Sequence, residues 1–378
     1  MQRVKIAVVH ESRPGETRVA IVPELVTKLT ALGAHVSIET GAGAAADFAD
    51  DAYRAAGATV EAAAIDNADV VVSVQPLDIG KAHRLAAGTS TVSFFPAAQS
   101  LDLVRVLRAR GVTSFALELV PRISRAQSMD ALSSQALVSG YRCAIVAAER
   151  LRRFFPLNMT AAGTVPPAQV VVLGAGVAGL QAIATSKRLG AVVKAYDVRA
   201  AAAEEIRSMG AEAITLELET LEGAGGYARE MTSDRAERQR ELLAPYIAAA
   251  DALITTAAVP GRQAPLLVTR AMVEQMAAGS VVVDLAADTG GNVEGSVPGE
   301  EVRIGAAMVW GAANLPSQMP GPASRLYANN VTNLVTLMTK DGSFAPDFAD
   351  EIVATSCVTH AGEVRHQPTR QLLEGAGA

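Results

Sequence analysis

The chain alternates short runs of buried-type apolar residues with segments whose apolar residues recur at helical spacing. Its first half contains five runs that are typical of strands, at 4–9, 34–39, 68–74, 89–95 and 113–119. Helical segments lie between most of them, most clearly at 50–56 and 101–110. Strands that alternate with helices predict a doubly wound, Rossmann-like parallel α/β sheet.

A second series of strands follows a helical pattern that runs from 129 to 155. Its six strand candidates lie at 169–173, 191–196, 211–216, 251–256, 280–285 and 305–310. That number fits a complete dinucleotide-binding domain. A helix at 324–338 is expected to return to the first domain, with the tail from Asp341 packed on that domain's surface. We therefore predict a discontinuous first domain, 1–130 plus 324–378, and a second Rossmann domain, 131–323, entered by a linking helix at 131–155.

The second series opens with a glycine turn, VVVLGAGVAG, between a strand and a helix. Gly174 permits the tight turn, Gly176 lets the backbone approach a pyrophosphate, and Gly179 lets the helix pack closely on the strand. Asp197 ends the following strand, where a carboxylate accepts hydrogen bonds from the adenosine ribose and repels a 2′-phosphate. The pattern predicts an NAD site, and the alternative is a glycine turn that only packs a helix on a sheet.

Composition and charge exclude several other classes of protein. The 378 residues suffice for two cores, and 50% hydrophobic with only 4% aromatic residues suits α/β layers. A net charge of −6 gives no support to nucleic-acid binding. Cys143 and Cys357 are expected to be free thiols in a reducing cytosol, and the histidines form no metal-ligating pair. The chain shows neither a signal-peptide core nor an apolar run long enough to span a membrane.

A polar block, RISRAQSMD, lies between the two series of strands. The polar side chains that could face the second domain's nucleotide across a cleft are Arg122, Arg125, Gln127, Ser128, Asp130 and, just after the block, Ser133. No histidine or cysteine activates a serine there, so nucleophilic catalysis is not indicated. Hydride transfer requires only that the two reacting rings are held together and that water is excluded. The alternative is a structural helix N-terminus at which Arg122 pairs with Asp130.

Long motifs resemble the NAD(H)-binding domain I subunit of proton-translocating NAD(P) transhydrogenase. They are PRISRAQSMDALSSQ at 121–135, TAAGTVPPA at 160–168, GAGVAGLQAIATSKRLGA at 174–191, DVR at 197–199, GGYAREM at 225–231, the TTA and VPG segments around 255–261, and SVVVDLA at 280–286. The resemblance covers nearly the whole chain. It implies that NADH is held here and that hydride passes directly to NADP⁺ on a partner subunit (domain III). It further implies a membrane-spanning subunit that couples transfer to proton movement, a homodimer, and a cytoplasmic location at the inner face of the cell membrane.

The resemblance also assigns residues. The implied cofactor contacts are Arg122, Ile123, Ser124, Gln127, Ser128, Met129, Asp130, Gly174, Gly176, Val177, Gly179, Asp197, Val198, Arg199, Gly226 and Ala258. Arg122, Gln127, Asp130 and Tyr227 are implied at the nicotinamide end, with Ser133 in support. Gln127 would bridge toward the partner's nucleotide, and Tyr227 would lie on a loop that closes over the cofactor.

Two other functions remain open from the residues. An amino-acid dehydrogenase of the alanine dehydrogenase type shares the expected fold, and Arg18 and Asp288 occupy positions that such enzymes use. That enzyme also needs a lysine after the third strand and a histidine after the fourth, where this chain has Val74-Gln75-Pro76 and Phe95-Pro96-Ala97. Arg18 and Asp288 are therefore expected to be structural. A module that senses NAD without catalysis is the third possibility.

Overall fold

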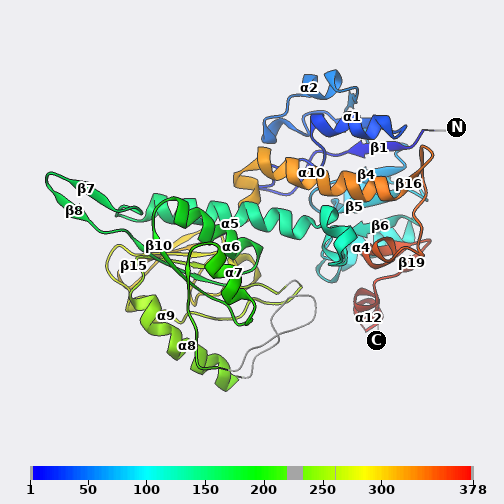
Figure 1. The fold of residues 1–378 in the computed structure, drawn as a ribbon. Helices are drawn as coiled ribbons and strands as arrows, with labels where there is room; N and C mark the ends of the chain where they lie inside the picture. The colour runs from blue at the N-terminus through cyan, green and yellow to red at the C-terminus, as the bar shows by residue number, and fades with distance from the viewer. Residues whose placement is uncertain (1–2, 219–232, 260, 376–378) are drawn as a thin grey trace. The chain divides into compact units, whose positions relative to one another are not determined.

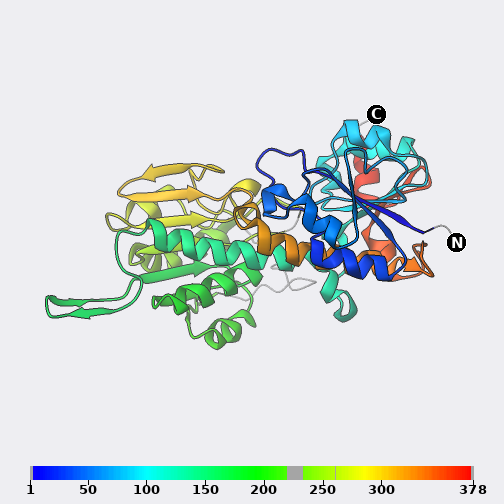
Figure 2. The same ribbon diagram turned by 90° about the horizontal axis from the view of Figure 1, so that it is seen from above.

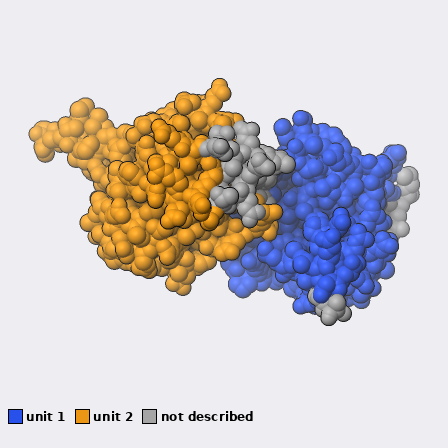
Figure 3. All heavy atoms as spheres, turned by 90° about the horizontal axis from the view of Figure 1, so that it is seen from below, with its two compact units in different colours: residues 1–135, 316–378 blue, residues 136–315 orange. Residues whose placement is uncertain are grey.

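The structure is a computed structural model that describes residues 3–218, 233–259 and 261–375. The chain forms two compact units, one of residues 1–135 with 316–378 and one of residues 136–315 (Figure 3). Their boundaries differ from the predicted ones, which fell after Asp130 and before Ser324. Each unit has its own parallel-dominated sheet, which confirms the predicted α/β fold class.

Unit 1 contains an eight-stranded sheet in the order β19-β18-β6-β5-β4-β1-β2-β3. Its strands are β1 (Lys5–Val8), β2 (His35–Glu39), β3 (Thr59–Glu61), β4 (Val70–Val72), β5 (Ser90–Ser93), β6 (Thr113–Ala116), β18 (Cys357–His360) and β19 (Glu363–Val364). Strands β1 to β6 pair in parallel. This is the arrangement that alternating strands and helices predict.

Both faces of the unit 1 sheet are buried, and since successive side chains of a strand point to opposite faces, neighbouring residues of β1 belong to different apolar clusters. Ile6 and Val8 join one apolar cluster, and Ala7 and Val9 join another. The helices of unit 1 are α1 (Pro23–Ala31), α2 (Asp50–Ala55), α3 (Ile79–Arg84), α4 (Leu101–Ala109), α10 (Pro320–Leu337), α11 (Glu351–Ser356) and α12 (Gln367–Gly375). Helix α10 lies beside α1, so the returning chain completes one of these faces (Figure 1).

The C-terminal tail is more ordered than we expected. Strand β18 pairs antiparallel with β6, and β19 pairs antiparallel with β18, so the tail extends the sheet instead of only covering its surface. A short hairpin, β16 (Thr339–Lys340) with β17 (Ser343–Phe344), precedes it. Strands of two to four residues give too little alternation for a sequence pattern to reveal them.

Helix α10 begins four residues before the predicted start at Ser324. Pro320 and Pro322 mark a break in the sequence, yet both lie in the first turn of the helix. The first N–H groups of a helix have no acceptor within it, so a proline there sacrifices no hydrogen bond. Pro320 and Pro322 therefore begin the helix and do not interrupt it.

Unit 2 contains a seven-stranded sheet in the order β11-β10-β9-β12-β13-β15-β14. Its strands are β9 (Gln169–Leu173), β10 (Val192–Tyr196), β11 (Glu212–Ala213), β12 (Ala252–Thr255), β13 (Val281–Asp284), β14 (Glu301–Ile304) and β15 (Ala307–Gly311). The six parallel strands have the order of a dinucleotide-binding domain. Strand β14, which we did not predict, adds an antiparallel edge to β15.

The unit 2 sheet is also buried on both faces. Val170 and Val172 belong to one apolar cluster, and Val171 and Leu173 to another. The helices are α5 (Ala131–Arg150), which crosses the boundary between the units in sequence, α6 (Val177–Arg188), α7 (Ala202–Ser208), α8 (Ser233–Ala248) and α9 (Arg270–Glu274).

Helix α5 ends at Arg150, earlier than the predicted end at 155. Residues 151–155 are not helical, and Pro156 keeps a helix from resuming at Phe155, because it restricts that residue to extended conformations. The TAAGTVPPA segment at 160–168 contains part of a hairpin that is formed by β7 (Asn158–Thr160) and β8 (Gly163–Val165). The hairpin projects from the rest of unit 2 in both ribbon views (Figures 1 and 2).

Candidate functional site

The glycine turn of unit 2 joins β9 to α6. Gly174 has φ +97°, a conformation that favours glycine, and a Cβ on Gly179 would lie 1.9 Å from the Gly174 carbonyl oxygen. At Gly176, the residue before α6, an added Cβ would meet nothing within 4 Å. The first helical hydrogen bond runs from the Leu180 N–H to the Gly176 carbonyl. The earlier N–H groups at this helix end are therefore suited to bind a pyrophosphate, and the space at Gly176 lets it approach.

Asp197 follows β10 and lies next to the glycine turn. Its Oδ2 accepts a hydrogen bond of 2.7 Å from the Ala175 N–H. Arg199 donates to the same carboxylate through its backbone N–H and Nε, both at 2.9 Å to Oδ1, and through Nη2 at 3.1 Å to Oδ2. The hydrogen bond to Asp197 raises the pKa of Arg199. The carboxylate expected to accept from a ribose is thus bonded to Arg199 in this structure.

Thr256 links the glycine turn to the segment that follows β12. Its hydroxyl donates to the Gly174 carbonyl at 3.2 Å, with a longer contact of 3.4 Å to the Leu173 carbonyl. Ala258, a predicted cofactor contact, is exposed two residues further on. The predicted residues of unit 2 therefore surround the carboxyl ends of β9, β10 and β12, the edge of the sheet at which such folds bind ligands.

The polar block of unit 1 forms a 3₁₀ helix, η4 (Ser124–Met129), just before α5. Ala126 and Met129 are buried, whereas Arg122, Gln127 and Ser128 are exposed. Asp130 accepts from the Ser133 N–H at 2.9 Å and from the Ser133 hydroxyl at 2.6 Å. Asp130 therefore stabilises the first turn of α5.

Two elements of unit 1 hold η4 in place. Arg125 forms a bidentate pair with Asp350, at 2.7 and 2.8 Å, which lowers the pKa of the Asp350 carboxyl. Asn330 and Asn333 of α10 both donate to the Ser128 carbonyl. The exposed side chains of η4 are thus presented by a fixed backbone. The predicted site residues that the structure describes form two groups, one in each unit.

Arg18 is buried in unit 1 and bonded to other side chains. Its guanidinium donates to both carboxylate oxygens of Glu16, at 2.8 and 2.7 Å, and to Gln135 at 2.9 Å. Gln75 and Ser317 also donate to Glu16. Burial alone would raise the pKa of Glu16, but these bonds and the Arg18 charge lower it to about 2.

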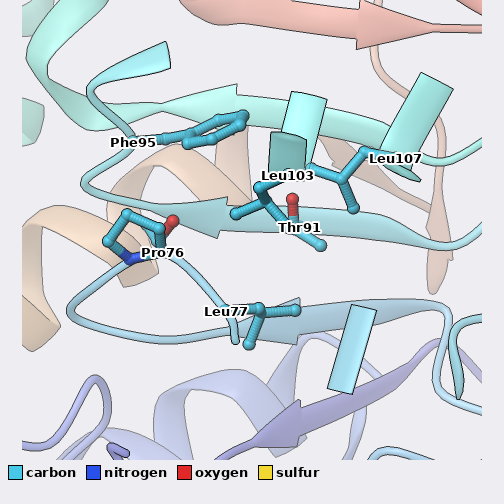
Figure 4. Close-up of a pocket in the computed structure, with 7 residues that line it drawn as sticks. Pro76, Leu77, Thr91, Phe95, Leu103 and Leu107 are labelled. Carbon is cyan, nitrogen blue, oxygen red and sulfur yellow. The ribbon is translucent and has the colours of Figure 1, made fainter. Parts of the chain in front are cut away.

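Asp288 and one small pocket of unit 1 share no residue with these two groups. Asp288 is exposed and accepts from the Asn314 N–H at 3.0 Å. Gly226 and Tyr227, on the predicted closing loop, lie outside the described residues. A small pocket in unit 1 is lined by Pro76, Leu77, Phe95, Leu103 and Leu107 together with Thr91 and Ser93 (Figure 4). It includes no predicted site residue.

Three residues that the sequence did not indicate help to hold these groups. Thr256 bonds to the glycine turn, Asn330 bonds to η4, and Asn292 bonds to the segment after β12. Each acts through backbone groups that are distant in sequence, so no local pattern reveals it.

Within the described ranges, no helix has both the length and the apolar character needed to cross a bilayer.

The two doubly wound units and the glycine turn define a Rossmann-type α/β protein whose second unit has the form of a dinucleotide-binding domain. The sequence model "Alanine dehydrogenase/PNT, N-terminal domain" matches residues 7–139. The corresponding "Alanine dehydrogenase/PNT, C-terminal domain" matches residues 143–367. The chain therefore belongs to the alanine dehydrogenase/PNT family.

Individual relatives agree with this assignment. An NAD(P) transhydrogenase alpha subunit of Rhodospirillum rubrum is 46% identical over 388 residues, which cover 99% of this chain and 100% of that protein. The crystal structure of transhydrogenase from Sinorhizobium meliloti matches with a TM-score of 0.87 and 42% identity, over 95% of this chain and 99% of that one. An L-alanine dehydrogenase structure matches with a TM-score of 0.83 and 27% identity, over 98% and 99%. The predicted family resemblance is confirmed.

Proposed function

We propose that this chain is the NAD(H)-binding subunit of a proton-translocating NAD(P) transhydrogenase. It holds NADH, and hydride passes to NADP⁺ on an NADP(H)-binding partner subunit, while a membrane-spanning subunit couples the transfer to proton movement. The observation that carries the proposal is the open helix end at Gly176 with Asp197 beside it, since this pair fits a dinucleotide. The identity to transhydrogenase subunits along the whole chain supports the choice of reaction.

The residues of unit 2 bind the cofactor in this proposal. The glycine turn with Val177 receives the pyrophosphate, the Asp197-Val198-Arg199 segment receives the adenosine ribose, and Ala258 contacts the cofactor from the segment after β12. Val177 supports this assignment, because it is 39% exposed at the first position of α6. Asp197 favours NAD, since its charge opposes a 2′-phosphate.

The residues of unit 1 act at the nicotinamide end in this proposal. The contacts are Arg122, Ile123, Ser124, Gln127, Ser128, Met129 and Asp130. Bound NADH would supply the hydride from its nicotinamide ring, so the protein has only to orient the ring and exclude water. Ser133 holds Asp130 in place. Gln127 is exposed on η4, which suits a side chain that bridges to the partner's nucleotide. Tyr227 and Gly226 remain predicted contacts.

Amino-acid oxidation is disfavoured by the surroundings of Arg18. An alanine dehydrogenase needs an arginine for the substrate carboxylate, a lysine and a histidine. Here Arg18 is bonded to the Glu16 carboxylate, and Gln75, which occupies the lysine's place, donates to the same carboxylate. Phe95-Pro96-Ala97 occupies the histidine's place and provides no acid or base.

We further propose that the chain is a homodimer, located in the cytoplasm at the inner face of the cell membrane through its partner subunits. The β7–β8 hairpin supports self-association, because it and the preceding loop expose large apolar side chains. Met159 is 74% exposed, Phe154 58% and Leu157 52%. Apolar groups gathered on one projecting element are typical of protein interfaces. Met159→Asp should then shift the sedimentation coefficient to that of a monomer, and an unchanged coefficient would exclude the hairpin from the interface.

The direct test is reduction of an NADP⁺ analogue by NADH, catalysed by this chain with and without an NADP-binding domain from a related transhydrogenase. Rapid reduction that requires both components supports the proposal. NADH binding without any reduction would identify an NAD sensor instead. Reduction of NAD⁺ in the presence of L-alanine, without a partner, would identify an amino-acid dehydrogenase.

A further inference from the structure

Asn292 is fully buried in unit 2, and its side-chain amide bonds to both ends of one segment. Its Oδ1 accepts from the Ala257 N–H at 3.0 Å, and its Nδ2 donates to the carbonyls of Ala257 and Pro265, each at 2.8 Å. A buried amide requires such partners. The two bonded residues flank Ala258, so Asn292 fixes the base of the segment that carries a proposed cofactor contact.

Asp284 in turn fixes Asn292. It lies fully buried at the carboxyl end of β13 and accepts from the N–H groups of Asn292 and Val293 and from the Thr255 hydroxyl. Gly291, with φ +81°, lets the chain pass over this carboxylate, since an added Cβ would lie 3.0 Å from Oδ2. The carboxylate therefore determines where the Asn292 backbone lies.

The same segment is attached to the glycine turn. Thr256 precedes Ala257 and donates to the Gly174 carbonyl. Hydrogen bonds thus link Asp284 to Asn292 and Asn292 to Ala257, and the peptide bond joins Ala257 to Thr256, which bonds to the turn. Polar networks of this kind, when fully bonded, hold a backbone in one arrangement.

The strand order indicates which part of a dinucleotide this network serves. Strand β9, with the glycine turn, lies between β10 and β12. Asp197 follows β10, on the adenosine side, whereas the segment held by Asn292 follows β12, on the other side of the turn. A dinucleotide across the carboxyl ends of these strands would place its nicotinamide half toward β12.

We propose that Asn292, held by Asp284, is a positioning residue for the nicotinamide half of NAD(H). The inference rests on the proposed function, because it assumes that unit 2 binds NAD(H). Because Asn292 is fully buried, it acts through the backbone of Ala257 and Pro265 and not by direct contact with the cofactor. Its loss should weaken the binding of the whole dinucleotide and leave recognition of the adenosine half nearly unchanged.

The test compares two probes, NADH and 5′-AMP, titrated into the full chain by calorimetry. Asn292→Ala should weaken NADH binding at least about tenfold and 5′-AMP binding less than about threefold. Ser280→Ala is the matched control: Ser280 is buried just before β13, at the opposite end of the sheet, and its hydroxyl bonds to the Ala250 carbonyl at 3.3 Å. The control should leave both affinities unchanged.

A merely structural role would lower the unfolding temperature without separating the two affinities. Equal weakening of both probes, or no weakening of either, would overturn the inference. If Asn292→Ala does not fold, Asn292→Ser retains a small polar side chain and should show the same separation. Failure of the wild-type chain to bind NADH would instead refute the proposed function, so the two failures are distinguishable.

Discussion

Arg199 provides a sharp test of how this chain chooses its cofactor. Its guanidinium donates to both oxygens of Asp197 and to the Ala175 carbonyl, and it is 21% exposed. The positive charge therefore partly neutralises the carboxylate that should repel a 2′-phosphate. Arg199→Ala would leave the Asp197 charge opposed only by backbone N–H groups. We predict that this variant discriminates more strongly between NADH and NADPH.

Coulomb's law gives the size of the effect. The substitution removes the attraction between the Arg199 guanidinium and the 2′-phosphate of NADPH. Two unit charges about 6 Å apart interact by about 0.7 kcal/mol in water and by about 3 kcal/mol at an effective dielectric constant of about 20. Arg199 and Asp197 follow β10 at the carboxyl end of the unit 2 sheet and are partly exposed, so a value near the middle of this range applies. About 1.4 kcal/mol corresponds to a tenfold change. The ratio of the NADPH to the NADH dissociation constant should therefore rise about tenfold.

The assay is fluorescence titration of NADH and NADPH into wild type and Arg199→Ala, at low and at high ionic strength. High salt should reduce the difference, because it screens exposed charges. Arg207→Ala is the control, since Arg207 is an exposed arginine in the last turn of α7. An unchanged or smaller ratio in Arg199→Ala would show that Arg199 does not offset the charge of Asp197.

Three further predictions concern other residues. Gly176→Ala should fold normally but bind NADH at least about tenfold more weakly. Gly179→Ala, whose Cβ would meet the Gly174 carbonyl, should also lose about 2 kcal/mol or more of stability. Calorimetry of NADH binding and thermal unfolding distinguish the two effects. Glu16→Gln should lower the free energy of unfolding by about 3 kcal/mol at pH 7, because folding lowers the pKa of this carboxyl to about 2. This stabilisation is complete above pH 4.5 and decreases as the pH falls toward 2. In urea unfolding, the difference from wild type should shrink by about 2 kcal/mol at pH 3, and a constant difference would contradict this account. Gln127→Asn should slow hydride transfer far more than it weakens NADH binding, and equal losses would remove Gln127 from the transfer step.

The sequence alone predicts the parts of the fold that depend on local pattern. Runs such as Val170–Leu173 are apolar throughout because both faces of a parallel strand are buried. An unbroken apolar run in the sequence therefore predicts where such a strand lies. The glycine turn and Asp197 were equally visible, since a tight turn, a close helix contact and a terminal acid each require one residue type at one spacing.

Other features depend on partners that are distant in the chain. Asn292 bonds to Ala257 and Pro265, and nothing in its neighbouring residues indicates those contacts. The pairing of β18 with β6 joins segments more than two hundred residues apart. The ion pair of Arg199 with Asp197 is local, yet the sequence does not show which of its possible partners an arginine takes. Such details follow from tertiary structure.

In the proposed function, hydride passes directly from NADH bound to this chain to NADP⁺ on a partner subunit. The most direct measurement is a single turnover with NADH that carries deuterium at both positions of nicotinamide C4, in ordinary water, with the chain and an NADP-binding transhydrogenase domain. Mass spectrometry of the NADPH formed should show the deuterium, because direct transfer between two nicotinamide rings involves no exchange with solvent. NADPH without deuterium, with the label released to water, would contradict the claim.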